Sequence, residues 1–147
     1  MKQSINDSVL SGAIAVARIL ICEDDELYQQ IADAAFAGSE HEVMFAPNGS
    51  EALKHLRAHP FDIVVTDLLM PDKDGLEVIR AIRDSSSNTP ILAMTAGLAS
   101  LKEPLLVAAS ALGANDVIQK PFRPIALRER VEALLIAARK DKNAIAV

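Results

Sequence analysis

The stretch that decides the fold is Ile63–Gly75, IVVTDLLMPDKDG. It opens with β-branched residues, which favour a strand, and Pro71 and Gly75 follow before a helical pattern begins. We therefore expect Asp67 to stand at the C-terminal end of a buried strand.

Three other segments place polar side chains at the ends of predicted strands. They are Glu23-Asp24-Asp25, Thr95-Ala96 and Lys120-Pro121. In an open parallel sheet the carboxyl ends of the strands share one edge, where ligand sites form. The sequence thus predicts that carboxylates, a hydroxyl and an ammonium meet at this edge.

Composition describes a globular chain and excludes several classes of protein. The 147 residues are 50% apolar and 24% charged, which fits one domain with a core. A net charge of -5, no Trp and 3% aromatic residues argue against nucleic-acid binding by this chain. Cys22 is the single cysteine, so no disulfide or thiolate metal site is available, and we expect a buried, inert thiol.

The apolar stretch Ala13–Cys22 does not predict a membrane segment. It contains Arg18 and is too short to cross a bilayer. It leads directly into the acidic cluster, which favours a strand over the apolar region of a signal peptide. We expect a cytoplasmic protein with no membrane partner.

Hydrophobic periodicity predicts alternating strands and helices. Strands are expected within 14–22 and at 42–46, 61–66, 90–95 and 116–119, and helices at 25–37, 50–58, 75–83, 103–112 and 124 to about 140. Leu27 belongs to the apolar positions of the first helix, Pro104 to the first turn of the fourth, and Ile125 to the buried side of the last. This alternation indicates an α/β protein with a parallel sheet covered on both faces. We divide it into an N-terminal extension (1–15), one domain (16–140) and a C-terminal tail (141–147).

Glu23, Asp24 and Asp67 suggest a metal site. Three adjacent carboxylates repel one another unless a cation intervenes, and Mg²⁺ or Mn²⁺ takes such oxygen ligands. The backbone carbonyl of Leu69 is placed to add another ligand. The alternatives are acids at a helix N-terminus and a loop-capping aspartate.

Lys120 and Thr95 add groups to this site that can bind a phosphoryl group. The ammonium pairs with a carboxylate at rest and with an incoming anion afterwards, and the hydroxyl donates to a phosphoryl oxygen. Asp67 is then a carboxylate that accepts a phosphoryl group as an acyl phosphate. The alternatives are a solvated surface lysine and a β-branched residue that ends a strand.

These segments form four motifs in a specific order: Glu23-Asp24, Thr66-Asp67-Leu68-x-Met70-Pro71-x-x-Asp74-Gly75, Met94-Thr95-Ala96 and Gln119-Lys120-Pro121-Phe122. With them the chain resembles the receiver domain of two-component response regulators over about Arg18 to Ala138. The resemblance implies a flavodoxin-like, doubly wound sheet of five parallel strands, ordered 2-1-3-4-5 and flanked by five helices.

The resemblance also implies a function. Asp67 would take a phosphoryl group from a phosphohistidine on a sensor histidine kinase or a histidine phosphotransfer protein. Glu23, Asp24, Asp67 and the Leu69 carbonyl would hold Mg²⁺, while Thr95 and Lys120 bind the phosphoryl oxygens. The protein would be a signalling switch, acting by protein docking or onward transfer, and not a conventional enzyme.

The chain departs from the family at several positions. Val117 stands where the family usually has an aromatic residue that moves on activation, and Leu69 and Gly97 flank the phosphoryl position without polar side chains. The segment between Thr95 and Lys120 is about three residues longer than usual, which we place at 99–103.

Two other functions remain open. One is an interaction module on a receiver scaffold that works without phosphorylation. The other is an aspartyl-phosphate hydrolase of the haloacid dehalogenase type, although Leu69 occupies the position of that family's second Asp. The almost entirely apolar helix 103–112 offers either exposed small side chains or a surface for self-association.

Overall fold

The computed structural model describes residues 16–70, 74–85, 87–96 and 99–146, and within α-helices it describes only the backbone of 99–103, 105 and 142–146. The predicted extension 1–15 and Gly97 lie outside the described residues.

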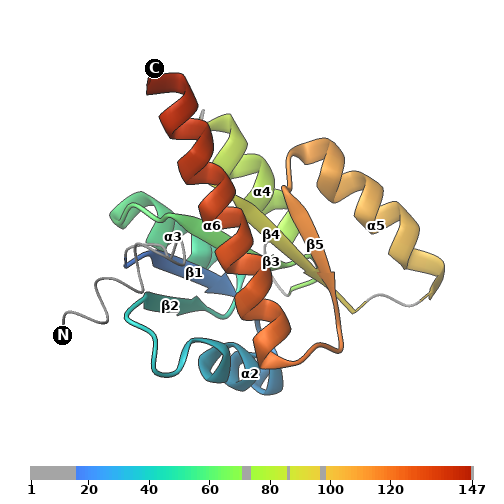
Figure 1. The fold of residues 1–147 in the computed structure, drawn as a ribbon. Helices are drawn as coiled ribbons and strands as arrows, with labels where there is room; N and C mark the ends of the chain where they lie inside the picture. The colour runs from blue at the N-terminus through green and yellow to red at the C-terminus, as the bar shows by residue number, and fades with distance from the viewer. Residues whose placement is uncertain (1–15, 71–73, 86, 97–98, 147) are drawn as a thin grey trace.

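Five parallel strands form one sheet (Figure 1). They are β1 (Arg18–Cys22), β2 (Glu42–Ala46), β3 (Ile63–Asp67), β4 (Ile91–Thr95) and β5 (Asp116–Gln119). Their order is β2-β1-β3-β4-β5, and every pairing is parallel. The flavodoxin-like topology implied by the resemblance is confirmed.

Helices cover both faces of this sheet (Figure 1). They are α2 (Glu26–Phe36), α3 (Gly49–Ala58), α4 (Gly75–Asp84), α5 (Ala99–Leu112) and α6 (Pro124–Ala146). The side chains of Asp25, Asn48 and Asp74 cap α2, α3 and α4, because each accepts a backbone N–H of the first turn.

Two hydrophobic cores follow from the alternation of side chains along the strands. Ile19, Val65 and their neighbours pack against α2 and α6. Leu20, Val64 and their neighbours on the other face pack against α3, α4 and α5. All five residues of β3 are buried, as expected for the central strand of a sheet with two covered faces.

Several details of the sequence prediction are wrong. The fourth predicted helix begins at Ala99, so Pro104 lies inside α5 and not in its first turn. Pro104 is exposed, and because proline has no N–H, the helix lacks one internal hydrogen bond at this position. Leu27 and Ile125 are each 58% exposed instead of buried.

The last helix differs from its prediction in length. It continues to Ala146, so the helix passes through the boundary we placed after residue 140. Its 23 residues span roughly 35 Å, whereas a strand of five residues spans roughly 16 Å. The helix is therefore longer than the core is deep. Ile125 is exposed because it lies two positions, roughly 200° around the helix, from the buried Leu127.

Gly75 begins α4 close to the end of β3, at the sheet edge that carries Asp67. Its N–H donates to the carbonyl of Leu68 at 3.2 Å. A Cβ at this position would lie 2.8 Å from the carbonyl carbon of Asp67 and from Cα of Leu68, which are backbone atoms. The start of α4 can therefore approach the end of β3 only because residue 75 has no side chain.

We expect Gly75→Ala to lower the free energy of unfolding by about 2 to 3 kcal/mol, because the backbone must shift to admit the methyl group. Urea denaturation followed by circular dichroism measures this. The matched control is Gly38→Ala, since nothing lies within 4 Å of the new methyl there and only the positive φ of 78° opposes it, a cost of about 1 kcal/mol. Equal losses for the two variants would contradict the steric explanation.

Candidate functional site

The predicted ammonium and two of the predicted carboxylates meet at the carboxyl edge of the sheet. Lys120 Nζ donates to Asp67 Oδ2 at 2.9 Å and to Glu23 Oε1. All three residues are buried, Glu23 completely. They follow or end β5, β3 and β1, so the tertiary structure unites residues that are 97 and 53 positions apart.

Glu23 is in an unfavourable environment for a charged carboxylate. Its Oε2 atom is buried and has no hydrogen-bond partner in the described part of the chain. Burial, reinforced by the nearby Asp67, raises the pKa of Glu23 to about 8, against the opposing effect of Lys120. Burial alone would lower the pKa of Lys120, but its hydrogen bonds with Glu23 and Asp67 outweigh burial and raise it.

Asp24 completes a cluster of three acids. One carboxylate oxygen from each of Glu23, Asp24 and Asp67 lies within 4.8 Å of the others. Asp24 is exposed, so the cluster opens to solvent on its side. Oxygen donors of this kind, together with the unpartnered Oε2 atom of Glu23, fit a hard divalent cation.

Backbone hydrogen bonds hold the segments of the site in register. Lys120 N donates to the Thr95 carbonyl at 2.8 Å, and Leu68 N donates to the Met94 carbonyl at 3.0 Å. Thr95 is 2% exposed and lies at the end of β4, as predicted. Leu69 N donates to Asp67 Oδ1 at 3.1 Å, which orients the carboxylate.

Sequence reasoning missed Tyr28. Its ring centroid lies 4.1 Å from Lys120 Nζ, and its ring contacts that of Phe122 at 5.4 Å. The sequence signal that could have identified it is an aromatic residue in the first turn of the helix that follows the acidic cluster. Its partner, Phe122, ends the last of the four motifs. Val117, by contrast, packs partly buried against the core on the α3, α4 and α5 side.

The thiol of Cys22 is buried at the end of β1, as expected. Burial raises its pKa to about 12, so the reactive thiolate is disfavoured.

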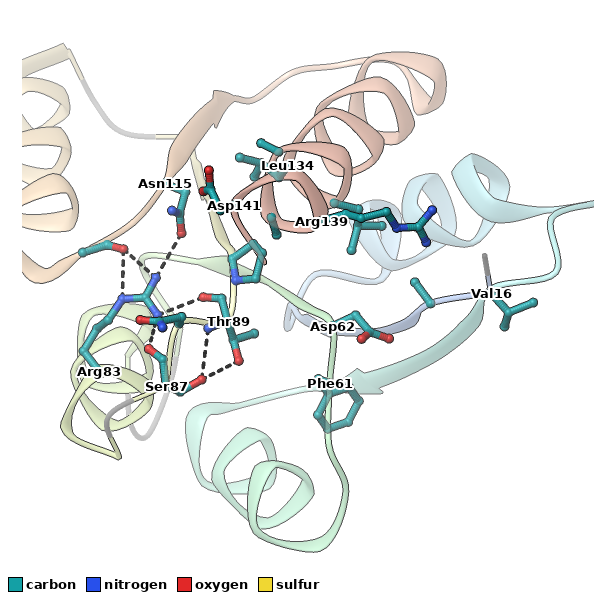
Figure 2. Close-up of a pocket in the computed structure, with 17 residues that line it drawn as sticks. Val16, Phe61, Asp62, Arg83, Ser87, Thr89, Asn115, Leu134, Arg139 and Asp141 are labelled. Carbon is teal, nitrogen blue, oxygen red and sulfur yellow. Dashed lines mark hydrogen bonds between the residues drawn. The ribbon is translucent and has the colours of Figure 1, made fainter. Parts of the chain in front are cut away.

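A groove of about 1010 Å³ lies at the opposite edge of the sheet (Figure 2). Its lining includes Asp62, Pro90 and Asn115, which directly precede strands. Arg83 points toward it in the figure, but all five of its N–H groups donate to the carbonyls of Ser87, Thr89 and Gly113 and to Asn115 Oδ1. The guanidinium therefore joins α4 to the turn before β5 and has no donor left for a ligand.

Comparison with known proteins identifies the class to which this fold and its acidic edge belong. Residues 19–132 match the response regulator receiver domain family, and the chain belongs to that family. Members of this family are signalling domains and not classical enzymes.

Individual relatives agree with this assignment. The chain is 34% identical to the transcriptional regulatory protein RprY of Bacteroides fragilis over 126 residues, 86% of this chain and 52% of RprY. Its structure is similar to that of the chemotaxis response regulator CheY4 of Vibrio cholerae, with a TM-score of 0.72 and 29% identity over 82% of this chain and 99% of CheY4. A CheY-like receiver domain protein from Methanospirillum hungatei shares the fold, with a TM-score of 0.78, 23% identity and coverage of 86% of this chain and 99% of that one.

The chain spans about half the length of the curated relatives it matches, as the 52% of RprY illustrates. Among the described residues, no helix is both long enough and apolar enough to cross a membrane.

The raised pKa of Glu23 predicts how the stability of the metal-free protein depends on pH. The folded state holds this proton more tightly than the unfolded state, whose reference value is 4.5. The contribution is therefore complete below about pH 4.5 and is lost as the pH rises through about 8. We expect the free energy of unfolding in EDTA to fall across this window in wild type more steeply than in Glu23→Gln.

Urea denaturation at a series of pH values measures this difference. Glu129→Gln, an exposed position on α6, controls for replacing a glutamate by its amide. Parallel pH profiles for wild type and Glu23→Gln would contradict the assigned titration.

Proposed function

We propose that this protein is a phosphorylation-dependent signalling switch in which Asp67 is the phosphoacceptor. The single observation that supports this most is the contact of Asp67 Oδ2 with Lys120 Nζ at 2.9 Å, beside two further carboxylates. Family membership supports the same function.

The transfer step requires a donor that approaches the carboxyl edge of the sheet. A carboxylate oxygen of Asp67 attacks the phosphorus of a phosphohistidine, an O–P bond forms, and the N–P bond breaks. The electron pair of that bond stays on the imidazole nitrogen, which then takes a proton. The product is an acyl phosphate on Asp67.

The surrounding residues neutralise and orient charge during this step. Lys120 moves its hydrogen bond from Asp67 to a phosphoryl oxygen, and the Thr95 hydroxyl donates to another. Glu23, Asp24, Asp67 and the Leu69 carbonyl would hold Mg²⁺ or Mn²⁺. A divalent cation bound there supplies positive charge against the phosphoryl oxygens.

The acyl phosphate ends by hydrolysis, in which water attacks the phosphorus and Asp67 leaves as a carboxylate with release of inorganic phosphate. The burial of Glu23, Asp67, Thr95 and Lys120 limits the paths by which water reaches the phosphorus. Self-phosphorylation and self-dephosphorylation are thus the chemistry we assign, and no turnover of a separate substrate.

The partners follow from this chemistry. The donor is a sensor histidine kinase or a histidine phosphotransfer protein, and the output is protein docking or onward transfer. Exposed Val107 is compatible with the predicted self-association through α5, which stays a prediction, as does a cytoplasmic location.

One observation favours a second function. Val117 is partly buried among aliphatic residues, so β5 has no ring there whose position could report phosphorylation. The protein would then be an interaction module that works without phosphorylation. Full signalling in cells by Asp67→Asn would favour this module and contradict the switch.

We expect wild type incubated with acetyl phosphate and Mg²⁺ to gain one phosphoryl group, and Asp67→Asn to gain none, because the amide is not a nucleophile toward phosphorus. Intact-protein mass spectrometry measures this. Asp25→Asn is the matched control, since Asp25 lies at the same edge but caps α2 through Leu27 N, a role that Asn also fills. Phosphorylation of Asp67→Asn would refute the assigned acceptor, and absence of phosphorylation in wild type would argue against this chemistry.

We expect chelation of divalent cations by EDTA to abolish this gain in mass. Asp24→Asn should weaken Mg²⁺ binding by about tenfold or more, because one negatively charged ligand becomes neutral. Isothermal titration calorimetry measures the affinity, and Asp74→Asn, which retains the cap of α4, is the control. Unchanged Mg²⁺ affinity in Asp24→Asn would remove Asp24 from the metal site.

A further inference from the structure

Tyr28 is the aromatic residue that contacts the charged centre. It lies on α2, partly buried, with its ring centroid 4.1 Å from Lys120 Nζ. No motif of the sequence assigned it a role. We propose that Tyr28 positions the Lys120 ammonium at rest and registers its displacement when Asp67 is phosphorylated, an inference that rests on the proposed function.

The contacts around Lys120 Nζ leave a defined place for the ring. The ammonium has three N–H groups, and the carboxylates of Glu23 and Asp67 take hydrogen bonds from it. The Tyr28 ring lies close enough to attract the ammonium through its quadrupole. Because Lys120 is buried, water screens this attraction only weakly.

A second aromatic contact orients the ring. Phe122 packs against Tyr28 with 5.4 Å between centroids and an angle of 56° between the planes. Phe122 follows Lys120 by two residues, so the segment that presents the ammonium also supports the ring that contacts it. Helices α2 and α6 lie side by side on this face of the sheet, and Phe122 lies just before α6 (Figure 1).

Phosphorylation changes what the ammonium binds. The acceptor of the Lys120 hydrogen bond moves from the Asp67 carboxylate to a phosphoryl oxygen farther from the β3 backbone. The ammonium must then shift relative to Tyr28, which changes the cation–π contact and the packing on Phe122. An aromatic side chain on α2 would therefore respond to phosphorylation. The position on β5 where the family usually has an aromatic residue is Val117 in this chain.

The sequence makes this response measurable without a label. It contains one Tyr and no Trp, so tyrosine emission comes from Tyr28 alone. We expect tyrosine emission of the full chain to change when Mg²⁺ and beryllofluoride, a phosphoryl analogue, are added, and to stay constant in Asp67→Asn. Mass spectrometry after incubation with acetyl phosphate is run on the same samples.

Kinetics test the positioning role. We expect Tyr28→Leu to slow phosphorylation by acetyl phosphate by about threefold to tenfold, the size expected for losing a partly desolvated cation–π contact. Tyr28→Phe should restore the wild-type rate, because it keeps the ring. In a Lys120→Gln background, Tyr28→Leu should have no further effect, whereas a merely structural role would slow both backgrounds equally. Phe61→Leu, at the opposite edge of the sheet, controls for replacing an aromatic residue by leucine.

The outcomes separate this inference from the proposed function. A gain in mass with unchanged tyrosine emission, or equal losses in both backgrounds, overturns the role of Tyr28 and leaves Asp67 as the acceptor. No gain in mass in wild type overturns the proposed function and this inference together. A gain in mass with an emission change, rescue by Phe and loss of the effect in Lys120→Gln supports both.

Discussion

The constraint on which the site depends is a single buried ammonium between two buried carboxylates. Lys120 hydrogen-bonds with Glu23 and Asp67, so one positive charge faces two negative ones away from water. Buried ion pairs tolerate desolvation only when every partner is satisfied, and removing one partner typically costs about 3 to 5 kcal/mol. Here Glu23 Oε2 lacks a hydrogen-bond partner among the described residues, and this imbalance favours uptake of a proton or a cation.

The polar side chains at the two edges of the sheet are arranged differently. At the carboxyl edge, the described residues that end or follow the strands bring the Lys120 ammonium and the carboxylates of Glu23, Asp24 and Asp67 close together. At the amino edge, Arg83 uses all its donors on the Asn115 side chain and on carbonyls of neighbouring turns. The same guanidinium would be a strong anion site if these acceptors were absent, which is why a groove of favourable size there does not predict function.

The departures from the family lie outside the four predicted site residues that end or follow the strands. Glu23, Asp67, Thr95 and Lys120 are buried at the strand ends where the motifs predict them. The aromatic residue near Lys120 belongs to α2, on the face covered by α2 and α6, whereas Val117 packs toward the other face. An output through α2 and α6 would therefore use a different surface from one that relies on β5.

The sequence by itself determined the parallel sheet and the edge where the motifs meet, while the order of the strands followed from the resemblance to receiver domains. Strand alternation, N-caps such as Asp74 and the four motifs are local signals, and the connectivity of parallel strands carries them to one edge. Only the tertiary structure decided that Glu23 is completely buried, that its Oε2 atom lacks a partner and that Tyr28 lies against Lys120. These properties depend on the packing of α2 against α6 and on distances between segments far apart in the chain, which no local pattern of residues encodes.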